Sequence, residues 1–105
     1  MKIEESNFGK FNISQLEKLP NGNYLTIIYP KFRLEVFNNN LFMLDSNWEV
    51  IWQLRQEEYN INWSKLPNTI TYFNIIGPNI IARSFEGIEL TIDFLGKITS
   101  HQFTK

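Results

Sequence analysis

The chain repeats itself with a period of 48 residues. When residues 11–57 are laid on residues 59–105 without a gap, eight of the 47 pairs are identical, including Tyr24 with Tyr72 and Asp45 with Asp93. A fixed period of roughly 20–50 residues is typical of a chain that builds one supersecondary unit and then repeats it. The sequence therefore predicts two similar structural units, residues 11–57 and residues 59–105.

The two units are expected to share one hydrophobic core. The chain has 105 residues and no cysteine, and a unit half as long is marginal by itself without a disulfide or a metal. We therefore expect a single domain over residues 1–105. The absence of cysteine excludes a disulfide framework and a thiolate metal site, and it is compatible with a reducing cytosol.

Each unit is predicted to be a four-stranded antiparallel meander, because short apolar segments, some with apolar and polar residues in alternation, are separated by turn signals. In the fourth segment of the first unit, Val50, Trp52 and Leu54 are expected to share a face. Before the first meander, Ser14 is expected to cap a short helical turn that ends at Pro20. The expected strands are Tyr24–Tyr29, Phe32–Phe37, Leu41–Asp45 and Glu49–Leu54 in the first unit, and Ile70–Ile76, Ile80–Phe85, Ile88–Asp93 and Lys97–Phe103 in the second.

The third and fourth segments of each unit carry a short motif. Residues 44–52 read Leu-Asp-Ser-Asn-Trp-Glu-Val-Ile-Trp, and residues 92–98 echo them, although Ser100 stands where the first copy has Trp52. This motif resembles the blade repeat of quinoprotein-type β-propellers, and the resemblance implies blade-like sheets. A complete propeller needs at least four blades. We therefore expect an all-β fold in which the two meanders pack as an eight-stranded sandwich, with a two-blade half-propeller as the alternative.

Residues that could carry catalysis are few. The chain has one histidine, His101, and Ser100 directly before it would point to the opposite face of a strand. Glu89 and Asp93 lie four residues apart, so their carboxylates would be about 13 Å apart on a strand, too far for a glycosidase pair. Neither a glycine-rich phosphate loop nor a calcium loop is present. We therefore expect a protein without catalysis, cofactor or metal.

The charge pattern excludes some partners. Ten basic and eleven acidic residues give a net charge of -1 and form no long run of one sign. Binding to nucleic acid through phosphates needs a basic face, which the sequence does not supply. No apolar run approaches the roughly 20 residues that span a bilayer, and no secretory signal is seen at the start. We expect a cytoplasmic protein that contacts neither nucleic acid nor membrane.

The tips of the third hairpins are the predicted binding site. Turn tips normally carry Gly, Asn, Asp or Ser, but here they carry large apolar residues, and exposed aromatic residues are the type enriched at interaction hot spots. The tips could instead fold back and cap the core. Because Asp45 and Asp93 recur at the same place, each is also expected to accept backbone N–H bonds in its turn. The predicted partner-binding residues are Trp48, Glu49, Glu86, Glu89, Asp93, Phe94 and Leu95.

These features favour a protein-binding module that acts as a monomer. The chain is similar in type to the small bacterial immunity proteins of contact-dependent inhibition and other polymorphic toxin systems, which implies a cognate toxin domain, such as a nuclease, whose active site it occludes. Two alternatives stay open. One is a structural module that closes into a propeller-like homo-oligomer, and the other is a lectin-like carbohydrate binder with Trp48, Trp52 or Trp63 as stacking platforms.

Overall fold

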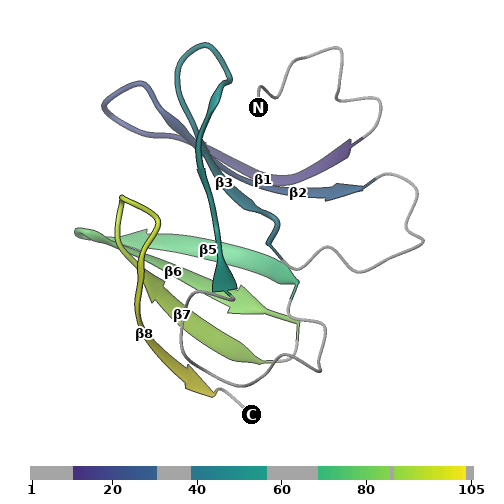
Figure 1. Ribbon diagram of the computed structural model, residues 1–105, viewed down its shortest axis with the longest axis vertical. Helices are drawn as coiled ribbons and strands as arrows, with labels where there is room; N and C mark the ends of the chain where they lie inside the picture. The colour runs from purple at the N-terminus through teal and green to yellow at the C-terminus, as the bar shows by residue number, and fades with distance from the viewer. Residues whose placement is uncertain (1–10, 31–38, 57–68, 86, 104–105) are drawn as a thin grey trace.

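The computed structural model describes residues 11–30, 39–56, 69–85 and 87–103, which form two four-stranded antiparallel sheets (Figure 1). Each sheet is a meander in which consecutive strands are neighbours. The first sheet contains β1 (Phe11–Lys18), β2 (Tyr24–Pro30), β3 (Leu41–Leu44) and β4 (Val50–Gln53). The second contains β5 (Ile70–Ile76), β6 (Asn79–Ser84), β7 (Ile88–Ile92) and β8 (Ile98–Phe103). The all-β prediction of two packed meanders is confirmed, and the sheets do not close into a barrel.

The first sheet differs from the prediction at its start. The helical turn expected after Ser14 is wrong, because these residues belong to β1, whose backbone pairs with β2 from Phe11↔Pro30 to Lys18↔Tyr24. Strand pairing satisfies the backbone groups that a helical turn would have left open. The expected strand Phe32–Phe37 lies outside the described residues. The strand that pairs with β2 on the side away from β1 is β3.

The two sheets share one plan, including their irregularities. The first strand of each sheet has a register shift, between Ile13 and Gln15 in β1 and between Ile70 and Tyr72 in β5. The pairing of the third and fourth strands has another, at Met43/Leu44 and at Thr91/Ile92. Such bulges bend and twist a strand locally. Bulges at matching places therefore indicate two copies of the same unit.

The register also corrects the alignment of the two copies. Tyr24 pairs with Leu44 as Ile80 pairs with Ile92. Leu44 and Ile92 are 48 residues apart, but Tyr24 and Ile80 are 56 apart. The period of 48 thus holds for the third and fourth strands, whereas the identity of Tyr24 with Tyr72 does not join equivalent positions.

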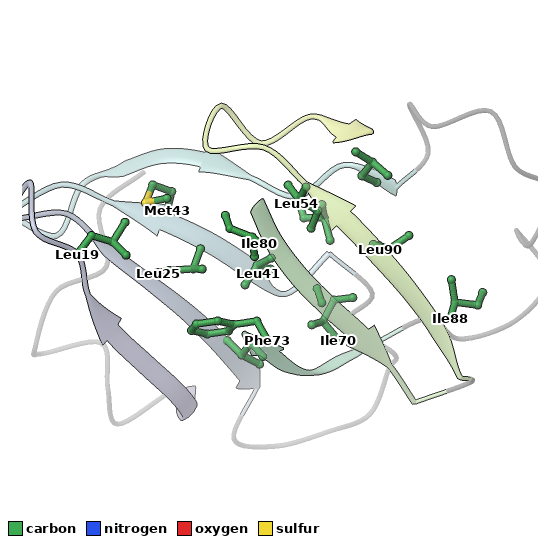
Figure 2. Packing of buried hydrophobic residues seen from close by; sticks show 14 residues of the cluster. Leu19, Leu25, Leu41, Met43, Leu54, Ile70, Phe73, Ile80, Ile88 and Leu90 are labelled. Carbon is green, nitrogen blue, oxygen red and sulfur yellow. The ribbon is translucent and has the colours of Figure 1, made fainter. Parts of the chain in front are cut away.

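The sheets pack through faces that are not equivalent. We call the face with Phe42 and Leu44 the front of the first sheet, and the face with the equivalent residues Leu90 and Ile92 the front of the second. The main core lies between the back of the first sheet and the front of the second (Figure 2). A smaller buried cluster, with Ile28, Phe42 and Leu44, lies on the front of the first sheet. The main core consists of Leu19, Leu25, Ile27, Leu41, Met43, Leu54, Ile70, Phe73, Ile80, Ala82, Ile88, Leu90, Ile92 and Ile98.

A bulge in β4 divides residues that were expected to share a face. Leu44 pairs with Val50 and Met43 pairs with Trp52, so Ile51 is the extra residue. As a result Val50 packs with the front cluster, whereas Trp52 and Leu54 join the main core. The expectation that all three share one face is wrong, because one inserted residue breaks the alternation of a strand.

Two side-chain amides join the sheets along the edge of β5. The fully buried Asn40 donates from Nδ2 to the carbonyl of Ile70 (2.8 Å) and accepts from the Ile70 N–H (2.8 Å). In the same way, Gln15 donates from Nε2 to the carbonyl of Phe73 (2.8 Å) and accepts from the Phe73 N–H (3.0 Å). Tyr29 adds a fifth bond, from its hydroxyl to the Ile70 carbonyl at 2.7 Å. These bonds satisfy backbone groups that an edge strand would otherwise leave open to other chains.

Candidate protein-binding site

The β3–β4 and β7–β8 turns have the same hydrogen bonds. The Asp45 carboxylate accepts from the N–H groups of Asn47 (2.8 Å) and Glu49 (3.0 Å). The Asp93 carboxylate accepts from Leu95 and Lys97, both at 2.9 Å. The predicted structural role of the two aspartates is therefore confirmed. Each turn is also closed by backbone bonds between its ends, so both tips are held firmly in place.

The first sheet docks onto the β7–β8 turn through Trp52. Its Nε1 donates to the carbonyl of Phe94 at 3.0 Å. Its ring lies against Gly96, where an added Cβ would stand 2.7 Å from Trp52 Cδ2. Gly96 has φ 89°, which only glycine adopts without strain. The second sheet has no third sheet behind it in the described part of the chain, and Ser100 stands at the position of Trp52.

The two turn tips differ in how far their apolar side chains are exposed to solvent. Trp48 has φ 67°, and its ring stacks on Tyr24 with centroids 4.6 Å apart, so that it caps the front cluster of the first sheet. Leu95 is 86% exposed and Phe94 is 37% exposed. Of the apolar tips predicted to bind a partner, one folds back onto its own sheet and the other projects into solvent.

A hollow lies on each side of the exposed tip. Phe94 lines one hollow, of about 540 Å³, together with residues of the β1–β2 and β5–β6 turns. Leu95 and Gly96 line the other, of about 420 Å³, together with Ile51, Trp52 and Arg55. The three turns around the first hollow lie at one end of the molecule, on the left in Figure 1. The β7–β8 tip therefore projects between the two hollows.

The predicted acidic residues that the structure describes do not form one patch. Glu89 lies on the back of the second sheet, where it accepts from Arg83 Nε (2.8 Å) and from Gln102 Nε2 (2.9 Å). Asp93 is engaged within its turn. Glu49 is exposed beside the other tip, and Glu86 lies outside the described residues. Among the described residues of the predicted site, the apolar pair Phe94 and Leu95 is thus the part that is assembled as a projecting surface.

Sequence reasoning missed the polar back of the second sheet. Tyr72, Arg83, Glu89 and Gln102 form one row across its four strands. The equivalent row on the first sheet begins with Gln15 on β1 and continues through Ile27, Leu41 and Leu54. These three apolar residues are fully buried against the second sheet. The signal was present in the repeat alignment, where Leu41 and Leu54 fall on Glu89 and Gln102. A polar outer face is what the terminal unit of a stack needs.

The described residues also bear on three other features: a metal site, a membrane-spanning helix and a serine–histidine pair on one face. They contain no group of three or more His, Asp or Glu side chains that could hold a metal ion, and no helix long and apolar enough to cross a membrane. Ser100 pairs with Thr91 and His101 with Leu90, so the two side chains lie on opposite faces, as expected. The His101 ring meets the ring of Phe103 edge-on, with centroids 5.8 Å apart.

Comparison with known proteins identifies no relative: no protein-family model, curated protein or solved structure matches the chain.

Proposed function

We propose that the chain is a protein-binding module, and that it is an immunity protein whose β7–β8 tip plugs the active-site cleft of a cognate bacterial toxin. The carrying observation is Leu95, a large aliphatic side chain that is 86% exposed on a turn. Exposed apolar side chains are common in isolation, but this one sits on a turn whose backbone is fixed by the Asp93 carboxylate and by Trp52.

The rigidity of the tip supports a role in binding. A group that is already held in its bound geometry loses little conformational freedom on association, so more of the contact energy appears as affinity. Phe94, at the base of the same turn, adds an aromatic surface. A projecting hairpin flanked by two hollows suits a concave partner, and an enzyme's active-site cleft is such a surface.

Two observations favour this function over the alternatives. A propeller-like homo-oligomer would stack a further sheet on the back of the second sheet, but that back carries the row with Arg83 and Glu89 in place of apolar residues. A lectin-like binder would need open tryptophan rings. One ring, Trp48, is stacked on Tyr24, another, Trp52, covers Gly96, and Trp63 lies outside the described residues.

The test uses the turn of the first sheet as a template. The double variant Phe94→Ser/Leu95→Asn gives the exposed tip the residues Ser46 and Asn47, which the other turn carries with the same hydrogen bonds. Calorimetry would measure binding of the full chain to the toxin domain encoded beside its gene. We expect the double variant to weaken this binding by 2 kcal/mol or more, roughly thirtyfold.

A matched control removes another exposed aromatic side chain. Phe85 is 70% exposed at the β6–β7 turn, at the opposite end of the second sheet. Phe85→Ser should leave the affinity for the toxin unchanged. If no toxin domain is bound, the immunity function is wrong. If a toxin is bound equally well by the tip variant, the binding site lies elsewhere.

A further inference from the structure

The hollow beside Phe94 opens between the two sheets and has a mixed lining. It measures about 540 Å³, and its apolar surface includes Met43, Ile75 and Phe94. Glu17 and Lys18, at the end of β1, contribute the charged groups. A depression of this size with an apolar floor and a few polar groups is typical of a site that receives a side chain or small ligand.

The edge of β5 gives this hollow its polar backbone groups. Alternate residues of an edge strand direct their N–H and C=O groups away from the sheet. The N–H and C=O groups of Phe73 point away from the sheet, because both are bonded to the Gln15 side chain. The register between β5 and β6 is unbroken from Phe73 to Ile75, so the N–H and C=O groups of Ile75, two residues further along, point the same way. No described side chain binds Ile75 as Asn40 binds Ile70. One backbone donor and one backbone acceptor are therefore open to the hollow.

Glu17 lines the same hollow as Ile75. It follows Gln15 by two residues, so both lie on the same face of β1, and its register partner Leu25 belongs to the core between the sheets. Its carboxylate forms no hydrogen bond or ion pair with any residue that the structure describes. A carboxylate has no proton to donate, so Glu17 cannot satisfy the carbonyl of Ile75 as the Gln15 amide satisfies that of Phe73.

The neighbouring lysine does not supply the missing donors. The Lys18 ammonium group lies 5.9 Å from the centroid of the Tyr24 ring, in a cation–π contact. Tyr24 belongs to the front cluster of the first sheet, whereas Glu17 is on the side of the main core. Besides Lys18, the hollow therefore combines two acceptors, the Glu17 carboxylate and the Ile75 carbonyl, with one donor, the Ile75 N–H, and with the apolar side chains of Met43, Ile75 and Phe94.

We propose that this hollow receives an arginine side chain of the bound protein. A guanidinium group has five donors in one plane, which lets it bond a carboxylate and a nearby carbonyl together. Its aliphatic stem would lie on Met43 and Phe94, which suits a long side chain with an apolar stem. This inference rests on the proposed function, since it names the group on the partner that the hollow recognises next to the tip.

The test uses a small probe and the full chain without any partner. Benzamidine carries a planar cation on an apolar ring, and benzamide is its neutral analogue of the same shape. In ¹⁵N-correlated NMR titrations we expect benzamidine to shift the amide signals of Glu17, Ile75 and Phe94. It should bind roughly three- to fivefold more tightly than benzamide, as expected for an ion pair at an exposed carboxylate.

Two matched variants assign the discrimination to one carboxylate. Glu17→Gln should remove the preference for benzamidine, whereas Glu49→Gln, at an exposed carboxylate beside the other tip, should leave it unchanged. The same spectra report whether each variant is folded. Equal binding of the two probes, shifts confined to other residues, or an undiminished preference in Glu17→Gln would each overturn the inference.

The outcome is separable from that of the proposed function. A toxin that binds through Leu95, together with a hollow that does not prefer the cation, removes the inference alone. A hollow that prefers the cation in a chain that binds no toxin removes the proposed function and leaves the recognition chemistry in place.

Discussion

Replacing Gly96 by alanine would test how the two sheets are joined. At φ 89° the methyl group costs about 1–2 kcal/mol, because a side chain crowds the backbone in the left-handed region. The new Cβ would also stand 2.7, 2.9 and 3.0 Å from Trp52 Cδ2, Cγ and Cε3. Relieving such overlap by moving a packed side chain costs about 1–3 kcal/mol. We expect Gly96→Ala to lower the free energy of unfolding by roughly 2–5 kcal/mol.

The chain contains a matched control for the backbone part of this loss. Gly22 has φ 90°, and nothing lies within 4 Å of the position of an added Cβ. Gly22→Ala should therefore cost only the backbone part, about 1–2 kcal/mol. Urea denaturation of both variants would give the difference, which measures the contact between Trp52 and the β7–β8 turn.

A double-mutant cycle completes the test. In a Trp52→Ala background the ring is gone, so Gly96→Ala should cost no more than Gly22→Ala does in the wild type. Equal losses for Gly96→Ala and Gly22→Ala in the intact chain, or additivity of Gly96→Ala with Trp52→Ala, would refute the docking of the first sheet on this turn.

Three further predictions concern stability and can be checked by urea or thermal unfolding. Asp45→Ala and Asp93→Ala should each cost about 1–2 kcal/mol and should match each other, because each removes the same two hydrogen bonds; a loss at one site alone would contradict the shared turn. Asn40→Ala should cost roughly 2–4 kcal/mol and Gln15→Ala about half as much, since Asn40 is fully buried and Gln15 is not; the reverse order would count against the amide contacts. Trp48→Gly should be about 1 kcal/mol more stable than Trp48→Ala, because both lose the ring but only glycine relieves φ 67°; equal stability would argue against this backbone conformation.

The parts of the fold that sequence reasoning predicted well are local. The bonds of Asp45 and Asp93 are made within four residues, so the turn chemistry could be read from each segment alone. The strands of the second sheet were found for a similar reason. Their connections are short, and the apolar residues of β7 alternate without a break.

The parts that it missed depend on partners far away in the chain. Residues 14–18 form a strand because β2 lies beside them, and this pairing overrides the local signal of a helical turn between Ser14 and Pro20. The exact period of 48 hid the true correspondence of the first two strands, because ten residues separate β2 from β3 but only three separate β6 from β7. An ungapped alignment cannot follow a change of connection length.

The sequence alone determined that the chain is a pair of β meanders with apolar residues at two turn tips. The tertiary structure decided which tip is available to a partner. Trp48 and Leu95 are both large apolar residues after an aspartate, but Trp48 meets the ring of Tyr24, whereas Leu95 meets solvent. Burial depends on what the opposing surface offers, and for two sheets stacked front to back that surface differs between otherwise equivalent positions.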